Sequence, residues 1–248
     1  TNGDGTGDAI LTFPNGESIT LTGVTVDQVD TGAELHSMGI VCYVSGTMIT
    51  TARGDVAVED LRCDDSVLTA QGSYEPIVWK DRTTLTVKQL ETAPNLRPVR
   101  IKPGTFGNDK ALFVSQQHCM VVDVEGESRF VRAKHLAEYT GLAHIAKVKD
   151  AVTYHHVLLP EHAVIFANGA ASESFYPGPQ SLKTLSRSSL ASLVSTIAPV
   201  SGQSLDKAYG DRALPCLNGK DVKARDTPAM HLASLTKCVV TPEISAVG

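Results

Sequence analysis

The chain has 248 residues, 42% of them hydrophobic, so it is long enough to bury one sizeable globular core. Its 27 acidic residues outnumber its 22 lysines and arginines, and the net charge of -5 argues against nucleic acid or an anionic membrane surface as a partner. No stretch approaches the roughly 20 continuous apolar residues that a membrane span requires, so no span is expected.

Short runs of valine, isoleucine and threonine separated by turn residues predict a mainly β fold. The first unit lies between Ala9 and Val24, where two β-branched runs flank Pro14-Asn15-Gly16. Because Asn-Gly accepts positive φ, this pattern predicts a β-hairpin. Residues 1–41 are therefore assigned to the end of a flanking β module, with a connector from residue 31 onward.

Compact strand-turn-strand units follow from Cys42 to about Gly178, and we place the main domain at residues 42–178. The alternation of apolar and polar residues predicts strands at Met48–Thr51, Val56–Val58, Ser66–Ala70, Pro76–Lys80, Val99–Lys102, Ala111–Val114, Met120–Val124, Ile145–Lys149, Tyr154–Leu159 and Ala163–Ala167.

The pattern changes in the C-terminal extension, residues 179–248. Apolar residues that fall on one helical face predict an amphipathic helix that packs on the domain, and Pro199 should end this helix. The apolar residues are Leu182, Leu185, Leu190, Leu193, Val194 and Ile197. The rest of the chain to Gly248 lacks sustained periodicity and is expected to be a loosely organised extension.

The chain contains five cysteines, an odd number at irregular spacing and without a C-x-x-C pair. This spacing indicates neither a zinc site nor a dense disulfide framework, and no metal or other cofactor is expected. At least one thiol must be free or pair with another chain. Cys63 and Cys119 are interpreted as core or idle thiols.

Three segments carry a resemblance to a known family. The segment CYVSGTMITTARGDVAVEDLRCDDSVLT, which starts at Cys42, resembles the first conserved block of Hint (hedgehog/intein) domains. ALFVSQQHCMVV resembles the second block, with Ser115-x-x-His118 in place of the usual Thr-x-x-His, and YHHVLLPEHAVIFANG resembles the late block. The resemblance spans roughly residues 38–178 and is nearest to the bacterial intein-like branch found in secreted proteins of the calcium-repeat type.

The resemblance implies a compact, horseshoe-like all-β domain that cleaves its own chain. Cys42 would attack the carbonyl of Val41 in an N-to-S acyl shift, and the thioester would then pass to water or another small nucleophile, which releases the upstream polypeptide. Amide-to-thioester conversion runs uphill unless the amide is distorted or its nitrogen is protonated as it leaves. The motif assigns the proton to His118 and the distortion to Ser115.

The late block carries the histidines that would activate the second nucleophile, either His156 or His162. Inteins usually have an aspartate after the block's tyrosine, where this chain has His155. Adjacent strand residues point to opposite faces, and the Y-x-H pattern of the bacterial branch favours His156 at the site and His155 toward solvent. An exposed loop histidine is an equally good reading of His162.

Two further residues of the first block are assigned supporting roles. Thr47 follows the nucleophile after a short gap, and Asp65 takes the acidic position of the block. Aspartate readily accepts backbone hydrogen bonds in turns, so we expect Asp65 to tie a turn rather than to transfer a proton.

Several alternatives to cis cleavage are open. Full splicing is disfavoured, because Asn168-Gly169-Ala170 provides no cysteine, serine or threonine after the asparagine, and a lipid acceptor has no dedicated docking region. An inert Hint-like scaffold of a secreted adhesin or calcium-binding protein is the main rival, and a Cys/His hydrolase acting on other proteins is a third. The resemblance leads us to expect a secreted or cell-surface location.

Overall fold

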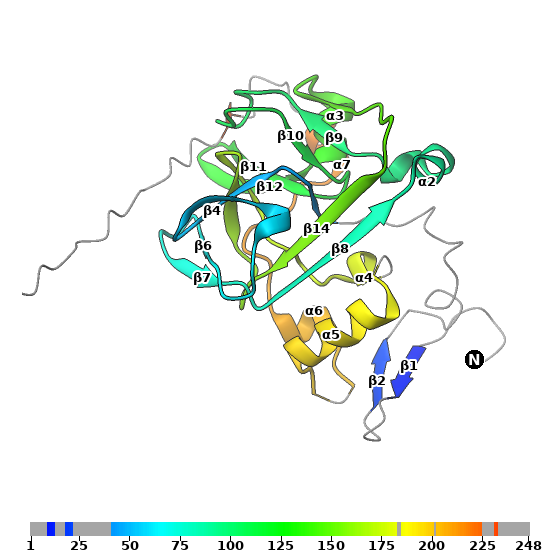
Figure 1. Ribbon diagram of the computed structural model, residues 1–248. Helices are drawn as coiled ribbons and strands as arrows, with labels where there is room; N and C mark the ends of the chain where they lie inside the picture. The colour runs from blue at the N-terminus through cyan, green and yellow to red at the C-terminus, as the bar shows by residue number, and fades with distance from the viewer. Residues whose placement is uncertain are drawn as a thin grey trace, which may run out of the picture.

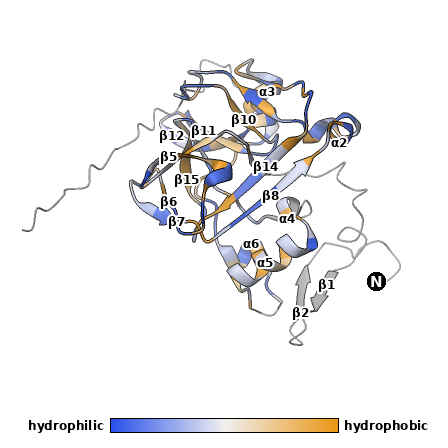
Figure 2. Ribbon diagram, viewed as in Figure 1, coloured by the Kyte–Doolittle hydropathy of each residue, from blue (hydrophilic) through white to orange (hydrophobic). Residues whose placement is uncertain are grey.

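A computed structural model describes residues 9–12, 18–21, 41–182, 185–200, 202–224 and 231–232. Within them the chain folds mainly as β-sheet around a buried core, as the sequence predicted. The strands of this core carry mostly hydrophobic residues, as β10, β11 and β15 illustrate in Figure 2. None of the described helices is long and apolar enough to cross a bilayer.

The predicted N-terminal hairpin is present: β1 (Ala9–Thr12) pairs antiparallel with β2 (Ser18–Leu21), so that Ala9 faces Leu21. The Pro14-Asn15-Gly16 turn lies outside the described residues, as does the connector up to residue 40.

Two larger antiparallel sheets form the domain (Figure 1). Among the described residues the first contains, in spatial order, β13 (Ala143–Ile145), β9 (Val99–Ile101), β10 (Leu112–Val114), β3 (Tyr43–Val44), β14 (Val152–Leu158) and β8 (Trp79–Leu85). The second runs β12 (Glu127–Arg132), β11 (Cys119–Val124), β16 (Ala170–Glu173), β15 (Val164–Ala167), β4 (Met48–Thr51), β6 (Ser66–Leu68) and β7 (Tyr74–Pro76), with β5 (Gly54–Ala57) beside β4 and β17 (His231–Leu232) beside β11.

Most predicted strands exist within one to three residues, but two were wrong. The run Pro76–Lys80 is split, because β7 ends at Pro76 and β8 begins only at Trp79. Proline cannot donate a ladder hydrogen bond, so it marks a strand end rather than a strand start here. The run Ile145–Lys149 is mostly loop, since β13 ends at Ile145.

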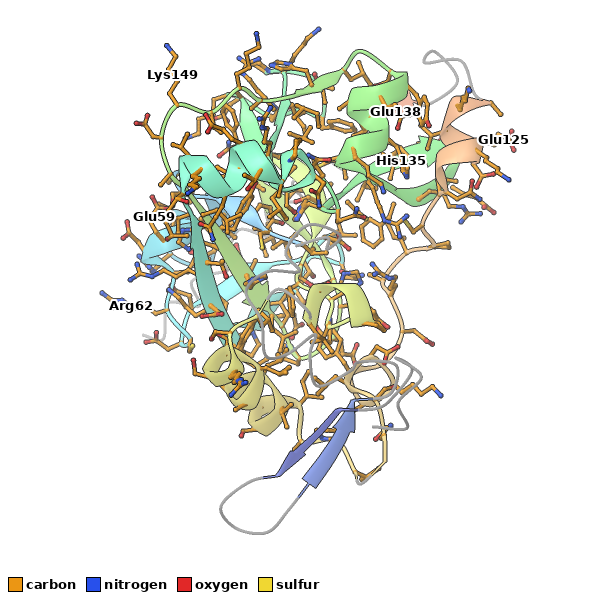
Figure 3. All side chains as sticks on the ribbon, turned by 90° about the vertical axis from the view of Figure 1, so that its right-hand side faces the viewer. Glu59, Arg62, Glu125, His135, Glu138 and Lys149 are labelled. Carbon is orange, nitrogen blue, oxygen red and sulfur yellow. The ribbon has the colours of Figure 1, made fainter. Side chains whose placement is uncertain are left out.

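Short helices join and flank the sheets. They are η2 (Val58–Asp60), α2 (Val87–Thr92), η3 (Pro94–Leu96), α3 (Ala133–Tyr139), α4 (Pro179–Leu182), α5 (Arg187–Ile197), α6 (Leu205–Tyr209) and α7 (Gly219–Lys223). Charged side chains such as Glu59, Arg62 and Lys149 lie on the outside (Figure 3). His135 of α3 lies close to the first residue of α7, Gly219, where a Cβ atom would approach the imidazole to 2.8 Å.

The C-terminal extension is more ordered than predicted. The expected amphipathic helix is present as α5, which begins after the N-cap Ser186 and buries Leu190, Leu193 and Val194. The predicted helix was too long, because Leu182 belongs to α4 and Leu185 lies between the two helices. The following residues also form α6 and α7, and these bury Leu205 and Val222. The expectation of a loose extension was therefore wrong for residues 202–224. Each of these short helices buries a single apolar residue, so the sequence shows no repeated apolar spacing there.

Helices α4, α5 and α6 gather at the end of the β8–β14 pair where β8 begins and β14 ends (Figure 1). Trp79 pairs with Leu158 there, and both belong to the apolar cluster that α5 covers. This end of the first sheet holds the site described next.

Candidate functional site

The candidate nucleophile Cys42 lies directly before β3 and is almost fully buried, with 1% of its surface exposed. Its Sγ atom lies 3.2 Å from Nδ1 and 3.5 Å from Nε2 of His156. Strands β3 and β14 are neighbours in the first sheet, and their pairing brings the two residues together across the chain. The structure thus joins two residues that the sequence had assigned to separate blocks.

The peptide bond before Cys42 shares the same imidazole. The carbonyl oxygen of Val41 lies 3.2 Å from Nδ1 of His156, as close as the sulfur. A protonated Nδ1 can donate to this carbonyl, whereas an unprotonated one can accept the thiol proton. One side chain is therefore within reach of both reacting groups.

Ser115 binds the Cys42 backbone on both sides. Its hydroxyl oxygen accepts a hydrogen bond from the Cys42 N–H at 3.1 Å, and its own N–H donates to the Cys42 carbonyl at 3.0 Å. This contact follows from the fold, because β10 ends at Val114 and Val114 pairs with Tyr43 of β3. The predicted contact of Ser115 with the scissile peptide is thus present in the structure.

His118 is buried beside this segment but makes no hydrogen bond to it. Its ring packs edge-on against Tyr43, with 4.4 Å between the ring centroids, and neither ring nitrogen has a hydrogen-bond partner among the described residues. Burial lowers the pKa of His118 to about 4, so the imidazole is neutral at neutral pH. The predicted proton transfer from His118 to the Cys42 nitrogen stays a prediction.

Burial also sets the charge of the Cys42–His156 pair. It raises the pKa of the Cys42 thiol well above its usual range and lowers the pKa of His156 to about 4. The pair therefore rests as a neutral thiol and a neutral imidazole rather than as a thiolate–imidazolium ion pair. Such a thiol becomes nucleophilic only when the imidazole takes its proton during attack.

Sequence reasoning missed Asp81, which lies opposite His156 in the β8–β14 ladder. Its Oδ2 atom is buried and has no hydrogen-bond partner among the described residues. The negative charge of Asp81 counteracts the effect of burial on the pKa of His156. The register of the two strands was the missing signal, since Asp81 falls just beyond the strand predicted for this segment. Two aromatic rings, Trp79 and Phe175, complete the surroundings of His156.

His162 lies in a different cluster from Cys42, and it is buried rather than exposed on a loop. Its Nδ1 atom accepts from the Ala213 N–H at 3.0 Å, and its Nε2 atom faces the Ser174 carbonyl at 3.2 Å and the Glu173 carboxylate at 3.4 Å. All of its hydrogen-bonding capacity is used there. Of the two histidines, His156 lies beside Cys42 and His162 does not, whereas the activation of the second nucleophile by either of them stays a prediction.

Glu173 is the centre of that second cluster and is fully buried. Its carboxylate accepts from the Cys119 N–H at 2.8 Å and from Arg212 at 3.1 Å. Burial alone would raise the pKa of Glu173, but the hydrogen bond from His162 and the neighbouring positive charges lower it to about 2. The carboxylate is therefore ionised and tightly bound.

The remaining predicted residues have structural contacts. Thr47 donates to the Val44 carbonyl at 2.7 Å, which closes the turn between β3 and β4. Asp65 accepts from Arg53 at 2.6 Å and from the Arg62 N–H at 2.8 Å, as expected of a turn aspartate. His155 was expected to face solvent, but it is buried, with 4% exposed, and contacts the Ser45 hydroxyl at 2.8 Å. The fold covers that face of β14 with the turn after β3.

Two other features bear on chemistry. Asn168 adopts a φ of 48° in the tight turn between β15 and β16, and its side-chain oxygen accepts from the Met48 N–H. This asparagine therefore stabilises a turn. No group of three or more histidine, cysteine, aspartate or glutamate side chains that could hold a metal occurs among the described residues.

The model of the Hint domain family matches residues 41–179. No curated protein matches the chain. Among solved structures, the chain is similar to a bacterial intein-like domain from Clostridium thermocellum (15% identity, TM-score 0.42, 55% of this chain and 99% of that chain). It is also similar to a splice-inactive variant of the AceL NrdHF class 3 split intein (18% identity, TM-score 0.40, 53% and 95%) and to the MchDnaB-1 intein (12% identity, TM-score 0.36, 53% and 99%).

The match to the family model decides the assignment. It covers more than half of the chain and includes Cys42, Ser115, His118 and His156. The chain belongs to the Hint domain family, whose members typically process their own polypeptide.

Proposed function

We propose that this Hint domain performs an N-to-S acyl shift at Cys42 and so cleaves its own Val41–Cys42 peptide bond. One observation supports this proposal above all others. Nδ1 of His156 lies 3.2 Å from the Cys42 sulfur and 3.2 Å from the carbonyl oxygen of Val41. A thiol, its proton acceptor and the adjacent carbonyl are therefore gathered at one point.

The first step forms one bond and breaks another. His156 takes the thiol proton as Sγ of Cys42 attacks the carbonyl carbon of Val41, and the oxygen becomes negatively charged. Charge that develops on this oxygen lies beside the new imidazolium, which stabilises it in a site that excludes water. Collapse of the tetrahedral intermediate expels the Cys42 nitrogen and leaves Val41 as a thioester on the sulfur.

The departing nitrogen needs a proton, and two residues of the second block bear on it, Ser115 and His118. Ser115 already accepts the hydrogen of this amide at 3.1 Å, which holds the peptide in one orientation. His118 is the motif's proton donor, and neither of its buried ring nitrogens has a hydrogen-bond partner within the part of the chain that the structure describes. We assign the thiol proton to His156 and retain His118 as the donor to the nitrogen. The neutral His118 ring gives the proton of one ring nitrogen to the departing nitrogen and takes up, on its other ring nitrogen, the proton that His156 releases. Both imidazoles are then neutral again, and Cys42 ends with a free amino group.

The second step releases the upstream polypeptide. Water, or an added thiol, attacks the thioester carbonyl, the carbon–sulfur bond breaks and Cys42 regains its proton. Hydrolysis leaves Val41 with a free carboxylate, whereas thiol exchange leaves Val41 as a thioester of the added thiol. His156 is the base for this step as well, because it lies nearest to the sulfur and the carbonyl.

An inert scaffold is the second candidate. The burial of Cys42 and His156, each 1% exposed, favours it, because an acceptor must reach a covered thioester. The two candidates differ in one measurable property, the fate of the Val41–Cys42 bond.

The test follows the full chain by mass spectrometry with and without added dithiothreitol. We expect a break between Val41 and Cys42 that the thiol accelerates and that Cys42→Ala abolishes. Cys63→Ala is the matched control, because this thiol is exposed and should not affect cleavage. An intact chain under every condition would exclude the proposal and leave the scaffold, whereas cutting of added proteins would indicate a hydrolase.

A further inference from the structure

The side chain of Val41, the residue before the scissile bond, is buried, with 6% of its surface exposed. It belongs to one apolar cluster together with Trp79, Leu158 and Phe175 from the domain and with buried residues of the C-terminal helices and the loop between α4 and α5: Leu182, Leu185, Leu190, Leu193, Val194 and Leu205. The substrate residue is thus part of a packed core and not a loose end of the chain.

Much of this cluster comes from outside the conserved domain. The family match ends at residue 179, whereas α5 begins at Arg187 and α6 ends at Tyr209. Tyr209 also fastens α6 to the domain through a hydrogen bond from its hydroxyl to the Leu159 carbonyl at 2.9 Å. These helices lie at the end of β8 and β14 that carries the site (Figure 1).

The cluster is continuous with the reacting groups. Trp79 and Phe175 pack against each other, with ring centroids 5.5 Å apart. Both also pack on His156, at 5.9 Å and 4.8 Å. The same imidazole contacts the carbonyl of Val41, so the position of the Val41 side chain in the cluster sets where this carbonyl meets Nδ1.

We propose that α4, α5 and α6, with Trp79 and Phe175, form a binding pocket for the side chain of the residue before the scissile bond. The pocket selects a small aliphatic residue at position 41, and by seating it the C-terminal helices position the carbonyl for attack. This inference rests on the proposed cleavage at Cys42, and it assigns a substrate-binding role to the part of the chain that follows the Hint domain.

Packing physics gives the expected selectivity. A filled core responds to single methylene groups, and an extra or missing methylene in an apolar pocket changes enzyme rates by about 10-fold to 200-fold. A displacement of the reacting carbonyl by about 1 Å reduces a rate by about 100-fold. We therefore expect cleavage to slow about 10-fold in Val41→Thr, which keeps the shape and adds a hydroxyl, and about 100-fold or more in Val41→Phe, which does not fit.

The decisive experiment enlarges the substrate residue and the pocket together. In the full chain, Leu190→Ala and Leu193→Ala each remove a buried side chain from α5, and we expect at least one of them to restore thiol-induced cleavage of Val41→Phe by about 10-fold or more. Leu136→Ala is the matched control, because Leu136 is equally buried but lies in α3 and belongs to a different apolar cluster. It should destabilise the protein without restoring cleavage.

A second measurement does not depend on cleavage. In the Cys42→Ala background, Val41→Phe should lower the melting temperature. The α5 variant that restores cleavage should also lower the melting temperature, but this decrease should be smaller when position 41 is Phe than when it is Val. Failure of both α5 variants to interact with Val41→Phe in this assay would overturn the pocket, whatever the activity. A further outcome is that the wild-type chain shows no cleavage while the effects of Val41→Phe and the α5 substitution on the melting temperature still depend on each other. That outcome would refute the proposed function and retain the pocket as a structural contact.

Discussion

Two buried histidines, His156 and His162, lie on neighbouring segments of the chain but in opposite chemical situations. His156 faces a neutral thiol and a peptide carbonyl. His162 faces a carboxylate that also binds a backbone N–H and Arg212. Both histidines are closed off from solvent, so exposure does not distinguish them.

The two histidines differ in whether their neighbours can still exchange a proton with them. Around His162, both ring nitrogens are engaged and Glu173 is ionised, with a pKa of about 2. A satisfied buried network of this kind stabilises one arrangement of the chain and offers no proton. Around His156, burial holds both acid and base neutral, so a proton can move between them only together with bond formation.

The largest effect that this comparison predicts is the loss of the His156 imidazole. His156→Ala removes the acceptor of the thiol proton, and we expect thioester formation to slow by about 100-fold to 10,000-fold. The rate is measured as thiol-induced cleavage followed by mass spectrometry.

The matched control is His162→Gln, which removes an equally buried imidazole from the other cluster. It should lower stability while leaving the cleavage rate of the folded fraction within a few-fold of wild type. Equal slowing by both variants would show that the two clusters act as one site.

The next largest effect concerns the Glu173 cluster. Glu173→Gln removes the charge that binds Arg212 and His162, and breaking a buried charge pair on one side costs about 3 kcal/mol or more. Urea unfolding in the Cys42→Ala background measures this loss without interference from cleavage. Glu161→Gln should be nearly neutral, because that carboxylate is exposed. A loss below about 1 kcal/mol would show that the cluster contributes little to stability.

The sequence predicted the residues of the site better than their contacts. Cys42, Ser115 and His118 follow from block motifs, because each motif fixes residue types along a single strand or strand end. Strand alternation separates His155 from His156, and the Y-x-H pattern of the bacterial branch gives the preference for His156. The solvent exposure expected for His155 was wrong, because the turn at Ser45 covers this side chain. Alternation shows that adjacent strand residues point to opposite faces, but it does not show which face the rest of the fold covers.

Contacts between strands that are far apart in the sequence could not be predicted from local patterns. Asp81 meets His156 only because β8 pairs with β14 in one register, and no local pattern fixes that register. His162 looked like a loop residue after Pro160-Glu161, but Glu173 and Ala213, which bury it, come from later segments. Strand β12 and helix α3 were missed because the segment ESRFVRAKH mixes polar and apolar residues without a clear period.

Acid should weaken the fold through the histidines that are buried in neutral form. Burial lowers the pKa of His118 and of His156 to about 4, whereas an unfolded histidine has a pKa of about 6.5. Between these values the unfolded chain binds protons that the folded chain does not, so the free energy of unfolding falls as the pH drops from about 6.5 to about 4. Each histidine should contribute a loss of about 2 kcal/mol between pH 7 and pH 5.

Urea unfolding of Cys42→Ala at pH 7 and pH 5 tests this dependence. His118→Gln should remove about half of the loss attributed to the two histidines, because it removes one of two similar groups. Glu173 does not confuse the result, since its own pKa lies at about 2 and its contribution is lost only below about pH 4.5. An unchanged pH dependence in His118→Gln would mean that His118 is already protonated or exposed.

The smallest predicted effect concerns Ser115, whose hydroxyl accepts one hydrogen bond from the Cys42 amide. Loss of a single such contact is worth about 1 kcal/mol, so Ser115→Ala should slow thioester formation only about 5-fold. Ser115→Thr keeps the hydroxyl and restores the family's usual residue, and it should cleave at least as fast as the wild-type chain. If Ser115→Ala matched the loss of His156, the hydroxyl would have to carry the proton to the departing nitrogen, because orienting the amide alone cannot account for a larger effect. The ratio of these two rates therefore separates a group that holds the peptide from one that transfers its proton.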